Sequence, residues 1–140
     1  MTEQDQKEIS RKKEYLKEYE KAVRQAERAE LKMREIHLSK IIPATVNNGM
    51  PHMRNDSDLS SYAILADRAE KEYIRYKNRQ FQKCDELTNK IERLENEDEK
   101  DILLYRYIRL LRWIDISEKM GYCRQHIHRI HKDALRNFKM

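Results

Sequence analysis

The sequence predicts an all-α protein: a long, coiled-coil-like antiparallel helical hairpin followed by a small C-terminal three-helix domain with a helix-turn-helix. Three observations predict this fold. First, 39% of the 140 residues are charged and only two are Gly and two are Pro, so the chain has few helix breaks. Second, residues 1–42 and 58–96 carry apolar side chains at three- and four-residue steps. Third, residues 97–140 contain shorter amphipathic runs around a single glycine, Gly121.

The first long helix is predicted over residues 1–42. Its apolar face is broad, and its residues repeat about every seven positions. One row is Ile9, Leu16 and Val23, and a neighbouring row is Tyr19, Ala26 and Met33. Four further apolar residues widen this face, namely Tyr15, Ala22, Ala29 and Ile36. Pro43 is expected to end the helix, because proline disfavours helical geometry in the residue before it. Residues 43–57 combine Pro, Gly, Asn and Ser, which predicts a loop.

The second long helix is predicted over residues 58–96, with Ser57 or a neighbour as its cap. One stripe contains Tyr62, Ala66, Ala69, Tyr73, Tyr76, Gln80, Cys84, Leu87, Ile91 and Leu94. A single loop joins two helices of similar length, so they are expected to fold back on each other as an antiparallel pair. Such a hairpin leaves apolar edges, which predicts a homodimer formed through the long helices.

Residues 97–140 are predicted to form the C-terminal domain. The acidic stretch around Asp98 suits a helix N-terminus, and the helix that follows carries Leu103, Tyr107 and Leu111 on one face. Trp113 is expected to start the next helix, at the edge of the core. Gly121 can adopt a left-handed backbone that reverses the chain. The residues expected to close the core between the last two helices are Ile116, Met120, Ile127 and Ile130, with the small Ser117 at their close approach.

This pattern leaves polar and basic residues on the outer face of the last helix, namely Cys123, Arg124, Gln125, His128, Arg129 and Lys132. In a DNA-binding helix-turn-helix, the N-terminal part of the second helix enters the major groove. Arginine there can pair with guanine and glutamine with adenine. Arg112 and Arg136 lie outside that part and are expected to meet phosphates. The alternative is an ordinary helical hairpin with a solvated basic face.

The location of the charge supports the DNA-binding interpretation. The net formal charge is +5. Residues 99–140 hold ten Lys and Arg against five Asp and Glu, whereas residues 1–98 hold twenty of each. The whole excess therefore lies around the predicted helix-turn-helix, where a basic patch favours phosphate binding.

The sequence argues against several other classes of function. It has no glycine-rich phosphate loop and no nucleophile with a base at a recognised spacing, so we expect no enzyme and no cofactor. His126, His128 and His131 lack the cysteine or carboxylate spacing of a metal site, and His131 is expected to pack beside Tyr107 or Leu135. The two cysteines form no disulfide framework. No membrane segment or signal peptide is evident, so a cytoplasmic protein is expected.

The run YIRLLRWIDISEKMGYCRQHIHRIHKDAL resembles the C-terminal part of the RinA and ArpU type transcriptional regulators encoded by phages, whose helix-turn-helix is similar to sigma factor region 4. The matching positions are Tyr107-Ile108, Trp113, Ile116-Ser117, Met120-Gly121-Tyr122, Arg129-Ile130-His131 and Ala134-Leu135. The stretch GMPHMRNDSDLSSYAI is also similar to that family, so the resemblance extends from about residue 49 to residue 138.

Two positions depart from the family pattern. Cys123 stands where the family usually has serine, and cysteine is a poor helix cap. Arg109 and Leu110 replace an acidic or small pair, which leaves Leu110 exposed.

The resemblance implies an activator of phage genes that works at promoters of bacterial RNA polymerase in the host cytoplasm. Its expected partners are double-stranded DNA and the polymerase. Two alternatives stay open. One is a phage small terminase subunit, which binds DNA as a ring and recruits the packaging motor. The other is a sigma-like polymerase subunit. The sequence shows no separate domain for a second promoter element, which counts against this alternative.

Overall fold

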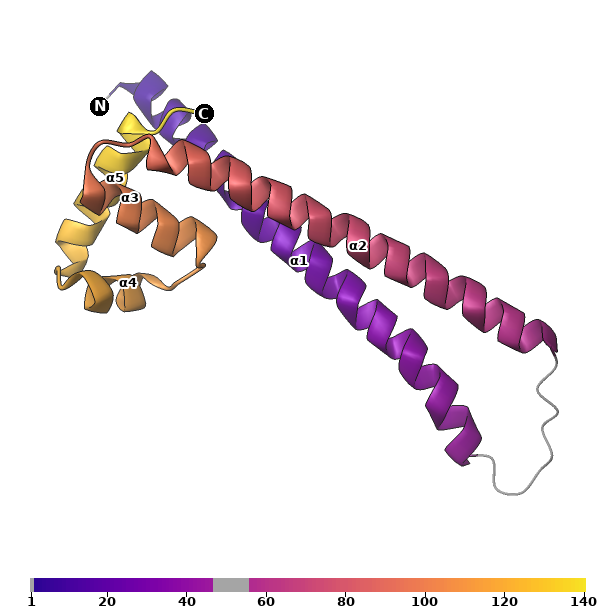
Figure 1. Ribbon diagram of the computed structural model, residues 1–140. Coiled ribbons are helices and arrows are strands. Elements are labelled where there is room, and N and C mark those ends of the chain that lie inside the picture. Colours follow the sequence, from indigo (N-terminus) through magenta and orange to yellow (C-terminus); the bar gives the residue numbers. More distant parts are fainter. Residues whose placement is uncertain (1, 47–55) are drawn as a thin grey trace. The chain divides into compact units, whose positions relative to one another are not determined.

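The computed structural model describes residues 2–46 and 56–140, and the side chains of residues 2–39 and 59–140 (Figure 1). Its elements are α1 (Glu3–Val46), α2 (Asp56–Glu92), α3 (Glu97–Leu103), the π-helix η1 (Leu104–Ile108), α4 (Trp113–Met120) and α5 (Arg124–Asn137). Within these described ranges every regular element is a helix. The all-α prediction is confirmed.

Helix α1 continues through Pro43, where the sequence predicted its end. Proline biases the preceding residue away from helical geometry but does not forbid it, so it marks a boundary only as a tendency. Of the predicted loop 43–57, residues 43–46 belong to α1 and residues 56–57 to α2, while residues 47–55 lie outside the described residues. The predicted cap, Ser57, has no described side chain.

The chain divides into two compact units, Met1–Ala22 with Phe81–Met140, and Val23–Gln80. Both long helices contribute to each unit. The sequence placed the start of the C-terminal domain at residue 97, but that position lies inside the first unit. The reason is a core that α3, η1 and α5 share with the N-terminal part of α1 and the C-terminal part of α2.

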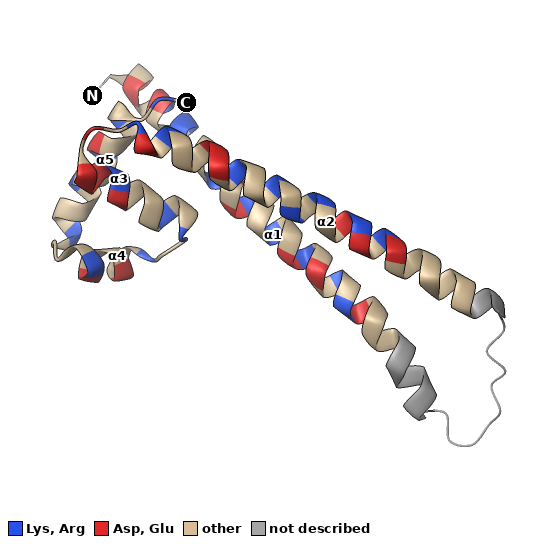
Figure 2. Ribbon diagram, in the orientation of Figure 1, with Lys and Arg blue, Asp and Glu red and all other residues tan. Residues whose placement is uncertain are grey.

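In the unit Val23–Gln80, small residues lie inside. Ala26, Ala29 and Ala69 are buried, as their apolar stripes predicted. Polar contacts link the two helices, with Lys32 Nζ 3.6 Å from a Glu72 carboxylate oxygen and His37 Nδ1 3.1 Å from the Tyr62 hydroxyl. Lys and Arg alternate with Asp and Glu along both helices (Figure 2), which is typical of solvated helix faces.

The larger core of the other unit joins both ends of the chain. Its buried members are Leu16, Leu87, Ile91, Leu94, Leu103, Tyr107, Ala134, Leu135 and Phe138. The predicted stripes contain Leu16 and Leu87, and both are confirmed as core. Beside this core, Tyr15 of α1 donates a hydrogen bond to Glu86 of α2 at 2.8 Å, so a polar contact also fixes how these two segments pair.

Polar contacts fasten the C-terminal end of α5 to the same unit. Lys12 is 6% exposed, and its ammonium donates to the carbonyl oxygen of Arg136 at 3.1 Å. A cation at the carbonyl end of a helix satisfies an acceptor without a partner and interacts favourably with the helix dipole. The buried Glu99 accepts from the Asn137 side-chain amide, which lies 3.1 Å from each carboxylate oxygen. The position of α5 therefore depends on α1 and α3.

The smaller core consists of Ile102, Ile116 and Ile127, all fully buried. Met120 and Ile130 pack against it, so the four residues predicted between the last two helices do form this core. The preceding helix, predicted to reach Leu111, changes at Leu104 into a π-helix that ends at Ile108. The wider turn is closed by the Arg109 N–H, which donates to the Leu104 carbonyl at 2.9 Å.

Leu110 terminates this segment in an unusual backbone conformation. Its φ of 57° is the only positive φ of a non-glycine residue in the described chain, and the side chain is 37% exposed, as its place in the sequence predicted. A left-handed leucine costs about 1–2 kcal/mol because its Cβ approaches the following carbonyl oxygen. The segment that joins η1 to α4 is therefore strained.

Candidate nucleic-acid interface

Helices α4 and α5 are joined by a short turn that side chains hold closed. Gly121 has φ 70° and ψ 24°, so the predicted left-handed backbone is confirmed, and its N–H donates to the Ser117 carbonyl at 2.9 Å. The Ser117 hydroxyl donates to the Tyr122 carbonyl across the turn. The Tyr122 hydroxyl in turn donates to Asp98 of α3 at 3.0 Å, a bond that raises the pKa of the tyrosine. Side chains of α3 and α4 thus fix this turn.

The start of α5 has no side-chain cap. Cys123 occupies the cap position with extended backbone angles, φ −67° and ψ 159°, and its side chain makes no capping hydrogen bond. The sequence predicted this weakness, because cysteine accepts a backbone N–H poorly. The first N–H groups of α5 therefore receive no side-chain cap, and they lie at the positive end of the helix dipole.

The face of α5 opposite the core carries the predicted site residues. Ile127, His131, Ala134 and Leu135 are buried on one side. The eight residues proposed from the sequence are all exposed: Cys123, Arg124, Gln125, His128, Arg129, Lys132, Arg112 and Arg136. Five of them follow each other along the outer face of α5 at steps of one and three residues and form one strip that a groove could accept: Arg124, Gln125, His128, Arg129 and Lys132.

The cations of this surface differ in their neighbours. Arg112 pairs with Asp115, with Nε 3.0 Å from a carboxylate oxygen, and this bond lowers the pKa of Asp115. Arg136 lies 3.7 Å from Asp133. By contrast, Arg124, Arg129 and Lys132 have no ion pair within the described part of the chain. These three remain available to an external anion. Arg112 and Arg136 could bind such an anion only in competition with their own ion-pair partners, Asp115 and Asp133.

A stack of aromatic and basic side chains supports the strip from beneath. The Trp113 ring centroid lies 4.9 Å from that of the exposed His128 and 4.7 Å from that of the buried His131. The Arg106 guanidinium lies 4.6 Å from the centre of the Trp113 ring, and it also donates to the Leu111 carbonyl at 3.0 Å. Trp113 is partly buried at the edge of the small core, as predicted, and it fixes the position of His128.

His131 and Tyr107 form a buried polar pair. The Tyr107 hydroxyl lies 2.8 Å from His131 Nε2, which confirms one of the two neighbours predicted for this histidine, Tyr107 and Leu135. Burial raises the pKa of Tyr107 to about 12. Burial, with Lys13, His128 and Arg106 nearby, lowers the pKa of His131 to about 3. At neutral pH the hydroxyl is therefore protonated and hydrogen-bonded to an uncharged imidazole.

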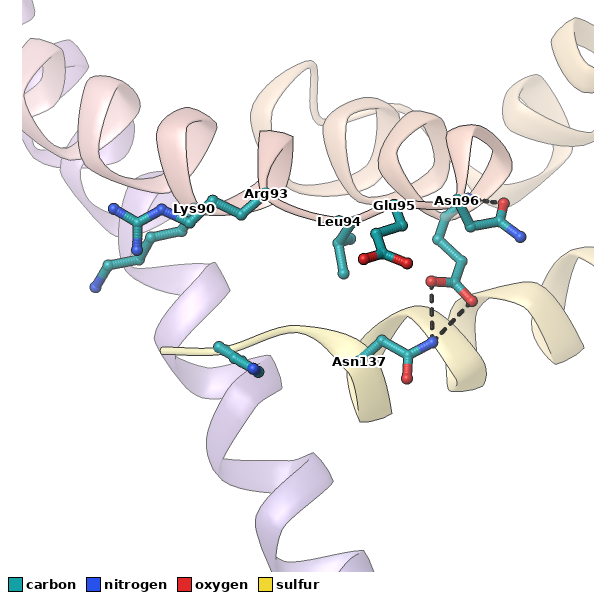
Figure 3. Close-up of a pocket in the computed structure, with 8 residues that line it drawn as sticks. Lys90, Arg93, Leu94, Glu95, Asn96 and Asn137 are labelled. Atoms are coloured by element: carbon teal, nitrogen blue, oxygen red, sulfur yellow. Dashed lines mark hydrogen bonds between the residues drawn. The ribbon is translucent and has the colours of Figure 1, made fainter.

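A cleft of about 560 Å³ lies at the other end of α5 (Figure 3). Its lining residues are Lys90, Arg93, Leu94, Glu95, Asn96, Glu99, Asn137 and Lys139. Figure 3 shows the two hydrogen bonds between Asn137 and Glu99 on one side of this cleft. None of the eight predicted site residues lines it, and its mixed charges suit a solvated joint between helices.

Comparison with family models, curated proteins and solved structures finds no match to this chain. Among the described helices, none combines the length and apolar character needed to cross a membrane. No group of three or more His, Cys, Asp or Glu side chains in the described residues is placed to hold a metal ion. The geometry of the α4–α5 surface is therefore the basis for assigning a function.

Proposed function

We propose that this protein is a sequence-specific, DNA-binding transcriptional regulator of the RinA and ArpU type, an activator that works on phage genes at promoters of bacterial RNA polymerase. In this proposal α4, the turn at Gly121 and α5 form the helix-turn-helix. Helix α5 is the recognition helix and double-stranded DNA is the partner. The observation that carries the proposal is the exposed strip on α5 over a closed core.

The chemistry of the strip suits the major groove. Arg124, Gln125 and His128 lie in the first turns of α5, the part of a recognition helix that meets base edges. All three are exposed. Arginine and glutamine offer the paired donors and acceptors that distinguish guanine and adenine. His128 is held by Trp113 at 4.9 Å, so this side chain is oriented before binding.

The electrostatics of the strip suit the DNA backbone. Arg129 and Lys132 continue the exposed face without an ion pair in the described residues, and Asp133 is the single acidic residue of α5. Each cation that neutralises a phosphate releases a counterion, so binding should weaken steeply as salt rises. The uncapped start of α5 adds N–H groups at the positive end of the helix dipole, which favour a phosphate.

The test is selection of DNA fragments by the purified full-length protein, followed by affinity measurements on the selected duplex and on a random one. Gln125→Ala should alter the sequence preference, at about 1–3 kcal/mol for a lost paired contact. Lys132→Ala is the matched control and should weaken both duplexes alike, with a salt slope lower by about one unit. Both side chains are exposed, so the melting temperature should not change.

Two outcomes would count against the proposal. Equal losses of affinity for both duplexes in the Gln125 variant would remove this face from base reading. A closed ring of many subunits in light scattering would favour the small terminase subunit, since a regulator of this type is expected as a monomer or as a homodimer formed through the long helices.

A further inference from the structure

Two basic side chains that do not belong to the strip on α5 lie near one ring of η1: Arg109, which follows η1, and Lys119 of α4. The guanidinium of Arg109 lies 5.3 Å from the centre of the Tyr105 ring, and the ammonium of Lys119 lies 5.5 Å from the same centre. Both cations are exposed. Two like charges on one ring repel each other, so an anion that binds beside them gains from both.

The two cations have no acidic partner of their own. Neither Arg109 nor Lys119 forms an ion pair within the described residues, whereas Lys100 and Arg112 pair with Glu97 and Asp115. Asp115 is close enough to Lys119 to feel its charge, but its oxygens are bonded to Arg112. Glu118, the other carboxylate of α4, acts on Arg112 as well. No ion pair in the described part of the chain therefore neutralises the positive charge at Tyr105.

The platform beneath these cations is rigid. Tyr105 is partly buried and packs against the small core of Ile102, Ile116 and Ile127. The Arg109 N–H is bonded to Leu104, and the Leu111 N–H donates to the Tyr105 carbonyl at 2.9 Å. The strained Leu110 between them sets the direction of the chain beside Arg109. π-helical turns are frequent at functional sites, and so are strained backbone conformations.

We propose that Arg109 and Lys119, with Tyr105 between them, bind the phosphate backbone of duplex DNA beside the groove that α5 enters. The inference rests on the proposed function. In a helix-turn-helix the first helix crosses the backbone while the second occupies the groove, and Lys119 lies in the last turn of the first helix. Contacts of this kind fix the register of the protein on DNA and carry no sequence information.

The experiment uses the full chain with Arg109→Gln and Lys119→Gln together. The salt slope should fall by about two units, because two phosphate contacts are lost. The affinity for selected and random duplexes should fall by the same factor. The charge-conserving pair Arg109→Lys with Lys119→Arg should keep the wild-type slope. A control pair, Lys71→Gln with Arg75→Gln, removes equal charge in the other unit from two exposed cations, one of which also lies over a tyrosine ring, and should change little.

The outcomes separate this inference from the proposed function. An unchanged slope in the Arg109 and Lys119 variant, while Gln125→Ala still alters sequence preference, overturns the phosphate site and leaves the reading face standing. Absence of any duplex binding by the wild type overturns both. A further experiment titrates the protein with inorganic phosphate alone and monitors binding through the NMR signals of Tyr105. Saturation by millimolar phosphate without duplex binding would identify a site for a small free anion, and would overturn the assignment to DNA.

Discussion

Replacement of His131 by glutamine should remove much of the acid sensitivity of this fold. The imidazole is 6% exposed, and burial lowers its pKa from 6.5 to about 3. In the unfolded chain the same group takes up a proton near its ordinary pKa. Between these two pKa values the unfolded state binds one proton more than the folded state, so stability is lost as the pH falls.

The size of the effect follows from linkage. One proton of difference changes the free energy of unfolding by about 1.4 kcal/mol per pH unit. Stability from this residue is fully present above pH 6.5 and declines toward the folded-state pKa of about 3. Between pH 6.5 and 5 the loss should be roughly 2 kcal/mol, a range in which carboxylates with ordinary pKa values contribute little.

The assay is chemical denaturation of the wild type and of His131→Gln at several pH values from 7.5 to 5. Glutamine is uncharged and its amide can donate to or accept from the Tyr107 hydroxyl, so the variant should lose little stability as the pH falls through this range. His128→Gln is the matched control: that histidine is exposed, and its removal leaves burial, the larger cause of the low pKa of His131, in place, so the variant should keep most of the pH dependence of the wild type. Parallel curves for the wild type and His131→Gln would refute the reasoning, since another group would then carry the pH dependence.

Three further predictions concern stability. Gly121→Val should lower the free energy of unfolding by about 1–3 kcal/mol, measured by thermal unfolding, and Gly121→Asn should lower it less. A Cβ at this position meets nothing within 4 Å, so the pair of variants tests only the left-handed backbone. Leu110→Gly should leave stability unchanged or raise it by up to about 1 kcal/mol, because relief of strain offsets the entropy of glycine; a clear loss would mean that the leucine side chain, and not its backbone, stabilises the loop. Lys12→Met should lower the free energy of unfolding by about 1–3 kcal/mol, because the Arg136 carbonyl loses its partner, and a denaturation midpoint equal to that of the wild type would contradict this role.

Periodicity predicted the fold well where neighbours in sequence decide it. The apolar steps at Leu16, Leu87, Ile116 and Ile127 mark residues that are fully buried. Gly121 marked the turn, because few other residues adopt a positive φ. Phe138 was missed, although it lies four residues after Ala134 and thus continues the buried row of α5. The signal was present in the spacing and lay just past the predicted helix.

Other features could not be predicted from local patterns. Nothing in the sequence near Lys12 indicates that its ammonium is buried against Arg136, since the two residues are far apart along the chain. The π-helix at Leu104 was hidden by an apolar pattern that suits an α-helix equally well. The same holds for Arg109 and Lys119, which become neighbours only because η1 and α4 pack on one core.

The shared core has a consequence for the candidate interface. Leu16 of α1 and Leu87 of α2 belong to the same buried cluster as Leu135 of α5 and Phe138, the residue that follows α5. Residues 99–140 alone would expose this apolar surface and would lack the Lys12 contact that satisfies the end of α5. Burial of one such side chain is worth about 1.5–3 kcal/mol, so loss of several exceeds the margin by which a small domain stays folded. The strip on α5 is therefore a property of a unit built from both chain ends, and changes near the N-terminus should affect it through stability.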